Sequence, residues 1–261
     1  MAAVALTVAP TWTTAAGAKT STATPVLGDL IVVIAAASGI TTNLGVSDNN
    51  SDGNGTYTFI KGASSLAGTV TIQAFVRAAF IGSATSTIWT TSGDGASTGG
   101  GLGVYRISGL TALTLTGISA IRQSAVQTNG GATATPSFSF SAAALTGNPL
   151  IGGVVNGSNA ATLTPPTGWT EDADLGYNTP ATGLEIVHIN SGFTGSSLTW
   201  GSTSATTFAA LALEIHTANP SVPGRVVSQA VSRAASRCWA QRPKSSILVP
   251  RIWTPDAPLT I

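Results

Sequence analysis

Three oxygen-bearing side chains alternate at the start of a polar loop. Asp48, Asn50 and Asp52 precede Gly53, an order similar to the first half of a calcium loop, where alternate oxygens converge on the ion and a glycine permits the sharp turn. The residue in place of the closing bidentate glutamate is Phe59, which excludes the helix-loop-helix version. The sequence favours a plain turn into a strand and leaves a weak Ca²⁺ site at Asp48, Asn50 and Asp52 as the alternative.

Other reactive side chains lack the neighbours that catalysis needs. Ser97 lies in a Gly-x-Ser-x-Gly string, but within a glycine-rich loop with no helix after it, whereas a serine nucleophile requires a strand-to-helix turn. The carboxylates between residues 171 and 174 are interpreted as one solvated polar loop. His188 has no second histidine or cysteine at ligand spacing. The sequence therefore predicts a protein that is not an enzyme and has no cofactor.

Alternation in the last strand separates its polar from its apolar side chains. Leu211, Leu213 and Ile215 share one face, and Glu214 and His216 share the other, because successive strand residues point to opposite sides. We expect Glu214 and His216 to pair at a surface.

Four tryptophans precede residue 217, and they divide by context. Trp89 and Trp200 hold matching places in two similar halves of the chain, which favours core packing. Trp169 follows a Pro-Pro-Thr-Gly turn, and is the stronger candidate for an exposed contact. With Tyr177 it forms a candidate glycan contact.

Short apolar or alternating segments recur between Gly, Asn, Asp and Ser clusters, a pattern of many strands joined by tight turns. No convincing helix precedes residue 220. The expected strands cover residues 4–8, 29–37, 56–61, 70–80, 85–91, 102–108, 113–118, 122–128, 136–141, 149–156, 184–190, 196–201 and 206–216.

The order of these segments indicates an internal duplication. The motif around Leu30 resembles the motif around Leu150, and Trp89 before Ile107 resembles Trp200 before Ile215. Two Greek-key halves closing over one core predict an all-β, jelly-roll-like antiparallel β-sandwich for residues 1–218. Two smaller sandwiches in tandem are the alternative.

The amino-acid composition indicates what kind of surface the protein has and in which compartment it is made. Charged residues are 8% of the 261 residues, against about 25% in ordinary domains, so small and hydroxyl side chains must form much of the surface. The single Cys238 cannot form an internal disulfide. The first residues lack a secretory pattern, and the longest apolar run, residues 30–37, is too short to span a bilayer. We expect synthesis in the host cytoplasm and no membrane partner.

The C-terminal region differs in charge from the rest of the chain. From residue 217 onward it carries six basic residues and one acid, whereas residues 1–216 carry five basic and nine acidic ones. Residues 219–261 are therefore interpreted as a basic, proline-containing anchoring arm with one short helix. Its basic density is too low to favour nucleic acid. Docking on its own body is the alternative to binding another chain. The predicted partner-binding residues are Arg233, Arg237, Arg242, Lys244, Ile247, Val249, Ile252 and Trp253.

Four sequence motifs follow one another between residues 26 and 216: a GDLIVVIAAAS strand, a GNGTYTF turn and strand, a GVYRISGL strand, and a second half containing TGLEIVHI and SSLTWGSTSATTFAALALEI. With these motifs in this order, the segment resembles a class of phage and bacterial β-sandwich proteins. The resemblance implies a structural module of a virion or a surface.

Together these features predict a non-enzymatic structural component of a tailed-phage virion, a capsid decoration or head-fibre-like protein anchored by its arm. The expected partners are other virion structural proteins, including further copies of the chain. The alternative is a glycan-binding, receptor-binding sandwich of a tail fibre or cell surface.

Overall fold

The computed structural model describes residues 2–10, 17–39, 44–53, 55–64, 70–93, 97–110, 117–128, 132–157, 163–178, 181–202 and 205–217, with the side chains of 176–178, 181 and 202 left out. All of these residues belong to one compact unit. The expected boundary at residue 218 and the whole arm lie outside the described residues.

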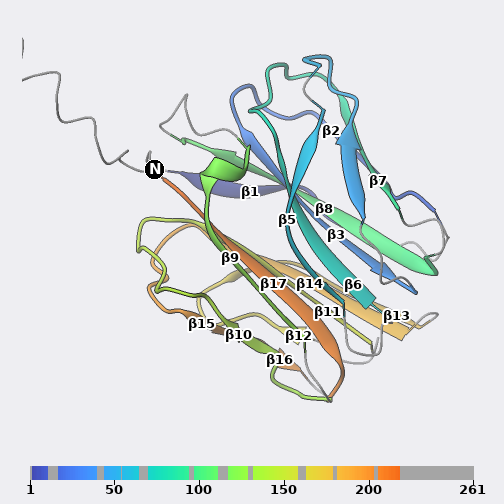
Figure 1. Cartoon of the computed structure of the whole chain (residues 1–261), viewed down its shortest axis with the longest axis vertical. Coiled ribbons are helices and arrows are strands. Elements are labelled where there is room, and N and C mark those ends of the chain that lie inside the picture. Colours follow the sequence, from blue (N-terminus) through green and yellow to red (C-terminus); the bar gives the residue numbers. More distant parts are fainter. Residues whose placement is uncertain are drawn as a thin grey trace, which may run out of the picture. The chain divides into compact units, whose positions relative to one another are not determined.

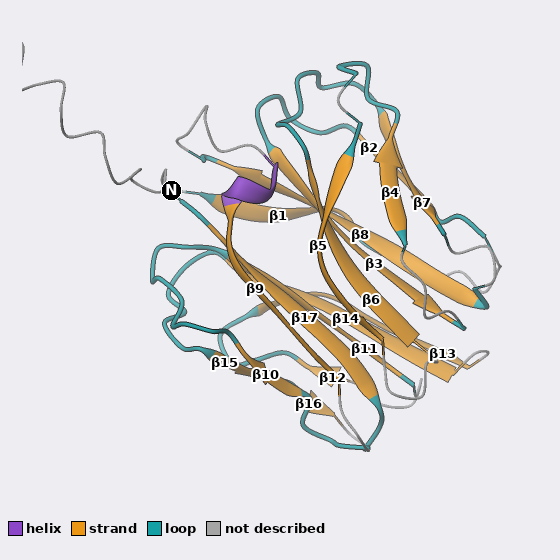
Figure 2. Cartoon of the chain, in the orientation of Figure 1, coloured by secondary structure: helices purple, strands orange, loops and turns teal. Residues whose placement is uncertain are grey.

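The described chain consists almost entirely of antiparallel strands, with one short 3-10 helix, η1 (Gly117–Ala120) (Figure 2). The prediction of an all-β sandwich is confirmed. The strands are β1 (Ala3–Val8), β2 (Thr20–Ala23), β3 (Leu30–Ser38), β4 (Gly45–Asp48), β5 (Tyr57–Ser64), β6 (Val70–Arg77), β7 (Thr87–Ser92), β8 (Gly99–Ser108), β9 (Ile121–Thr128), β10 (Ser137–Ser139), β11 (Leu150–Asn156), β12 (Leu163–Thr164), β13 (Thr170–Asn178), β14 (Ala181–Ile189), β15 (Ser197–Thr199), β16 (Gly201–Ser202) and β17 (Phe208–Ile215).

The strands form four layers (Figure 1). Two five-stranded sheets, ordered β1-β8-β3-β6-β5 and β9-β17-β11-β14-β13, lie in the middle. The sheet β2-β7-β4 covers the outer face of the first, and the pairs β10-β15 and β12-β16 cover the outer face of the second. Each half of the chain therefore builds a large and a small layer, in the same strand order.

Three separate hydrophobic cores fill the spaces between the layers. The central core lies between the five-stranded sheets and includes Ile34, Ile72, Ile186 and Leu211. The first outer core surrounds Trp89 and the second outer core surrounds Trp200. This arrangement combines both sequence interpretations, because each half is a small sandwich and the two halves also close over a shared core.

The central strands of each sheet are apolar on both faces because they are covered on both. In β3, Ile34 points into the central core and Val33 into the first outer core. All nine residues of β3 and all eight of β17 are buried. Such strands read as continuous apolar runs, which is why the sequence identified them.

The duplication is confirmed at the level of strand order, but the strings align one residue out of register. Leu30 points into the central core, whereas Leu150 points into the second outer core and Ile151 takes the central position. Because strand side chains alternate between faces, a shift of one residue reverses the face. The spatial counterpart of Leu30 is therefore Ile151.

Sequence reasoning missed four strands and misplaced one. Strands β2, β4, β12 and β13 were absent from the expectation, and each is short or lies at a sheet edge. Edge strands carry polar side chains that hide the apolar alternation. The strand expected at 113–118 is wrong at its end, since Gly117 and Ile118 belong to η1; residues 111–116 lie outside the described part.

The two five-stranded sheets interlock through glycines. A Cβ on Gly103 of β8 would lie 2.6 Å from Cδ1 of Ile186 on β14, and a Cβ on Gly153 of β11 would lie 2.9 Å from Cδ1 of Ile72 on β6. Each sheet thus offers a glycine that admits an isoleucine from the other. The close approach accounts for glycine in the middle of two buried strands.

Within the described residues, no helix has both the length and the apolar character needed to cross a membrane.

Candidate functional site

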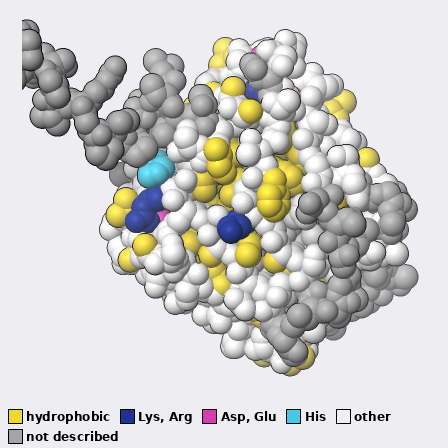
Figure 3. Space-filling model, viewed as in Figure 1, with side chains coloured by type: hydrophobic (Ala, Val, Ile, Leu, Met, Phe, Trp, Pro, Cys, Tyr) yellow, Lys and Arg dark blue, Asp and Glu magenta, His cyan; other side chains and the backbone are white. Residues whose placement is uncertain are grey.

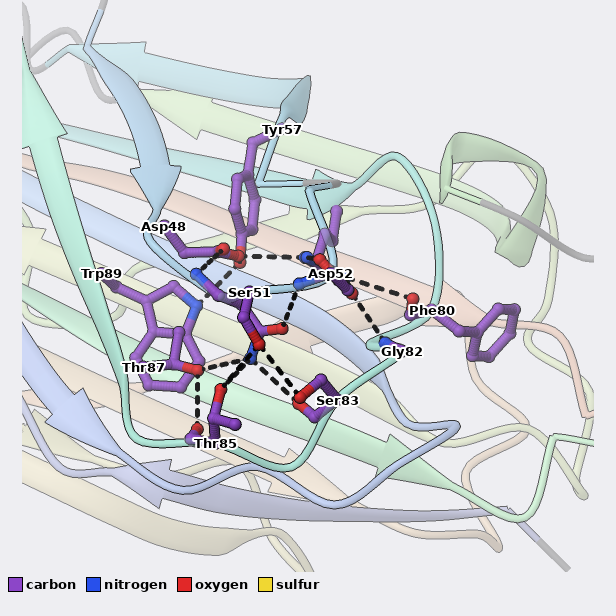
Figure 4. A network of polar contacts seen from close by, with 12 residues as sticks. Asp48, Ser51, Asp52, Tyr57, Phe80, Gly82, Ser83, Thr85, Thr87 and Trp89 are labelled. Atoms are coloured by element: carbon purple, nitrogen blue, oxygen red, sulfur yellow. Dashed lines mark hydrogen bonds and ion pairs between the residues drawn. The ribbon is translucent and has the colours of Figure 1, made fainter.

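The loop expected to be a turn or a calcium site belongs to a network of polar contacts that includes Asp48, Asp52 and Tyr57 (Figure 4). Arg77, at the end of β6, has a fully buried side chain. Its Nε lies 3.0 Å from Oδ2 of Asp48, and its Nη1 lies 2.8 Å from Oδ2 of Asp52. Tyr57 donates to Asp48 at 2.9 Å, and the backbone N–H of Gly82 donates to Asp52 at 2.7 Å. The guanidinium therefore occupies the centre on which the carboxylates converge.

The electrostatics of this cluster favour the ionised pair. Burial disfavours the charge on Arg77, but hydrogen bonds and charges from Asp52 and Asp48 raise its pKa above the ordinary value. Burial, followed by the charge of Asp48, raises the pKa of Tyr57, which keeps its hydroxyl a donor. The guanidinium of Arg77 therefore stays charged between Asp48 and Asp52.

These contacts bear directly on the calcium alternative. Asn50, the middle residue of the expected triplet, donates from Nδ2 to the Ser83 carbonyl at 2.9 Å and to Thr87 Oγ1 at 2.7 Å. Its Oδ1 accepts from the N–H of Asp52 at 3.2 Å. The triplet fixes a loop, and its charges are balanced by protein. No group of three His, Cys, Asp or Glu side chains in the described ranges could hold a metal ion.

A second polar cluster joins the two halves across the central core. The Tyr105 hydroxyl of β8 donates to Oδ2 of Asp172 on β13 at 2.8 Å, and Nδ1 of His188 on β14 lies 2.9 and 2.8 Å from the two oxygens of that carboxylate. The side chains of His188 and Asp172 are 11% and 7% exposed. The cluster gives a directional tie between sheets that otherwise meet through apolar side chains.

Glu214 forms the third cluster, and the expectation of a surface position for it is wrong. Its side chain is fully buried in the second half. It pairs with Arg122, accepts from Asn148 Nδ2 at 2.6 Å, and accepts from the Leu145 N–H at 3.0 Å. Burial alone would raise the pKa of Glu214, but these hydrogen bonds and that from Gln123 bring it below the ordinary value. The carboxylate is a buried structural anion.

The acidic segment expected to be a solvated loop is the edge strand β13, so that expectation is wrong. A β-bulge between Glu171 and Ala173 interrupts the alternation of the strand. Asp172 consequently contributes to the cross-half cluster, whereas Asp174 lies directly opposite Glu185 of β14. The pKa of Asp174 is raised by burial and by the charge of Glu171. Glu171, Asp174 and Glu185, hereafter the acidic hairpin, form one electrostatically coupled group.

Glu185 is the anomaly in this group. It is fully buried, and neither carboxyl oxygen has a hydrogen-bond partner in the described structure. Burial, followed by the charges of Asp174 and Glu171, raises its pKa to about 8. A buried carboxyl without a partner is costly, and costlier once ionised. The sequence expectation did not include Glu185; its only signal was an acid in an otherwise apolar strand.

Of the two candidate glycan residues, the structure describes the side chain of Trp169 alone. Trp169 is 7% exposed and packs edge-on against Phe193, with ring centroids 5.7 Å apart. The expectation that Trp169 is exposed is wrong, because its turn folds the indole into the second outer core. The side chain of Tyr177 lies outside the described residues.

Trp89 and Trp200, by contrast, are fully buried in the two outer cores, as the matching positions predicted. The partner-binding residues expected in the arm, namely Arg233, Arg237, Arg242, Lys244, Ile247, Val249, Ile252 and Trp253, lie outside the described residues.

No protein-family model, curated protein or solved structure matches this chain.

Proposed function

We propose that the chain is a structural component of a tailed-phage virion, a capsid decoration or head-fibre-like protein, in which the sandwich body is displayed and residues 219–261 are the anchor. The body acts as a rigid spacer and carries out no reaction. The anchor binds other shell proteins through its basic residues and its apolar residues.

The observation that carries this proposal is the use of charge in the body. Arg77 and Arg122 are both committed to buried carboxylates, and Arg106 lies 3.7 Å from Asp29. Buried ion pairs of this kind hold loops and strand ends in one geometry. The body's arginines therefore support its own architecture, and the basic residues available for a partner are concentrated after residue 217.

The outer surface supports the same proposal. On the face in Figure 3, charged side chains are few, and hydroxyl, amide and backbone atoms form most of the surface. Little charge has to be desolvated when such a surface meets a neighbour. Subunits can therefore pack over broad areas at a low cost in desolvation free energy.

Incorporation into particles tests the anchor. Cells producing the phage would be supplied with the full chain or with a chain that ends at residue 218, and purified particles would be assayed for the protein. We expect the truncated chain to be lost from particles. A matched full-length variant with Arg233, Arg237 and Arg242 changed to Gln should be incorporated less than the wild type. Normal incorporation of the truncated chain would contradict the proposal.

A further inference from the structure

We propose that the acidic hairpin of one copy binds a basic side chain from the C-terminal segment, residues 218–261, of a second copy. The inference rests on the anchoring role proposed above and names one partner for that anchor. The contact joins two different surfaces, so it can propagate around a ring of copies.

The first argument is the unpartnered carboxyl of Glu185. Other buried carboxylates in the described structure face a cation: Asp48 and Asp52 face Arg77, and Glu214 faces Arg122. Glu185 faces Asp174 and Glu171 instead. A cation brought to this group would interact favourably with the carboxylates of Glu171 and Asp174 and would favour ionisation of the buried Glu185.

The second argument is the distribution of charge along the chain. Residues 121–217 contain five acids and a single Lys or Arg, Arg122, which already binds Glu214. Among the remaining body cations, Arg77 and Arg106 lie against other acids, Lys61 is on β5 in the opposite five-stranded sheet, and the buried Lys19 donates from Nζ to the Gly17 carbonyl. The segment after residue 217 holds six basic residues against one acid. It is the complementary partner that the chain itself supplies.

The third argument is the position of the hairpin. Among the described residues, strand β13 is the last strand of its sheet, so no described strand lies beside its outer edge. Glu171 is exposed on this edge strand. The described chain ends beyond β17, which is separated from β13 by β11 and β14. A second copy can approach the edge directly, and the segment could extend roughly 140 Å at about 3.3 Å per residue.

The proposed contact uses the same kind of ion pairing as the Arg77 cluster in the first half of the chain. A cation placed between two carboxylates, whether a guanidinium or an ammonium group, makes charge-assisted hydrogen bonds to them. Arg77 with Asp48 and Asp52 is the intramolecular form of this arrangement. The acidic hairpin would receive the intermolecular form.

Zero-length cross-linking of mixed copies tests the contact. Full-length protein labelled with ¹⁵N is mixed with unlabelled protein, treated with a carbodiimide, and digested. Lys244 is the single lysine after residue 217, so an amide between Lys244 and Glu171 or Asp174 reports the segment on the hairpin. We expect cross-linked peptides that combine one labelled and one unlabelled partner. Peptides carrying a single isotope only would overturn the inference, as would the absence of any such link.

Variants separate the charge effect from a folding effect. Glu171→Gln with Asp174→Asn should weaken self-association of the full chain about tenfold in sedimentation experiments at low salt. Glu185→Gln, which keeps the shape, should weaken it as well. The control is Asp94→Asn, which removes a carboxylate outside the hairpin and should leave association unchanged. Equal association of all four proteins would overturn the inference.

The outcome is distinguishable from failure of the proposed function. If the mixed-isotope link is absent while truncation at residue 218 still abolishes incorporation, the segment anchors elsewhere and only this inference is lost. If the link is present while the truncated chain enters particles normally, the copy-to-copy contact stands and the anchoring role is lost.

Discussion

At the scale of single residues, the protein is defined by charges placed where water is absent. Arg77 and Glu185 lie on equivalent central strands, β6 and β14, of the two halves. The first is matched by two acids and the second is surrounded by two acids. Equivalent strands of the two halves thus hold a closed ion-pair cluster in one half and a buried carboxyl without a cation in the other.

Removing the guanidinium of Arg77 measures how much the closed cluster contributes to the free energy of unfolding. Arg77→Met leaves the buried carboxylates of Asp48 and Asp52 without their cation, and we expect a loss of about 3–5 kcal/mol in the free energy of unfolding, measured by urea denaturation. The control is Arg106→Met: the Arg106 side chain is 35% exposed and lies 3.7 Å from Asp29, so the loss should stay below about 1 kcal/mol. Equal losses would contradict the ion-pair assignment.

Glu185 should make stability fall as the solution becomes more alkaline. Its folded pKa of about 8 exceeds the ordinary value of 4.5. The folded state then keeps a proton that the unfolded state releases, so this contribution is complete below pH 4.5 and is lost as the pH rises toward 8. Glu185→Gln cannot ionise, and should lose less stability across that window, by an amount on the order of a few kcal/mol.

Denaturant unfolding at the two ends of the window measures this difference, at low protein concentration and about 0.5 M salt to keep copies apart. Glu214→Gln is the control, because the contribution of this carboxylate stays constant across the window and changes only below it. The pKa of Glu214 is lowered, so its contribution is present above pH 4.5 and is lost on acidification. Parallel pH profiles for wild type and the Glu185→Gln variant would contradict the prediction.

At the scale of elements, the sequence predicted most strands of the two large sheets and missed the short strands β2, β4 and β12 and the bulged edge strand β13. Buried strands such as β3 and β17 are apolar on both faces and cannot be mistaken. Strand β13 begins Thr-Glu-Asp-Ala-Asp, and its bulge breaks the alternation that would have revealed it. The candidate acids were noticed, yet their pairing with Tyr105 and Glu185 depends on register between distant strands, which local pattern does not encode.

Local sequence patterns did not predict the cluster around Arg77, for a similar reason. The triplet around Asn50 was identified as an oxygen-rich loop, and it is one. Its cation comes from Arg77, which is 25 positions beyond Asp52. Only the antiparallel pairing of β5 with β6 brings them together. Sequence reasoning favoured a plain turn, with Ca²⁺ as the alternative, and did not predict that an arginine side chain would pair with these carboxylates.

The interlocking glycines give a test of how the sheets approach each other. Gly103→Ala places a methyl group 2.6 Å from Cδ1 of Ile186, and overpacking of this kind costs about 1–3 kcal/mol. Ile186→Val removes that Cδ1 atom. We expect the double variant to be less destabilised than the sum of the single ones, a coupling measurable by a double-mutant cycle in urea. Strict additivity would show that the sheets do not meet through this contact.

At the scale of the whole molecule, the outer cores are separated by two complete sheets. Trp89→Phe and Trp200→Phe each leave a small void, and each should lower the free energy of unfolding by about 1–3 kcal/mol. Because the two sites share no neighbours, the losses should add to within about 0.5 kcal/mol in the combined variant, as thermal and urea unfolding can report. A coupling larger than that would mean that strain passes through the central core.

The four-layer order has one further consequence for what the chain tolerates. Each outer layer packs against the outer face of its own five-stranded sheet, which the opposite outer layer does not contact. Side chains there can be exchanged for others of new charge or shape while the far side keeps its geometry. The outer layer of one half can therefore acquire a binding surface while the outer layer of the other half and the two central sheets keep their structure.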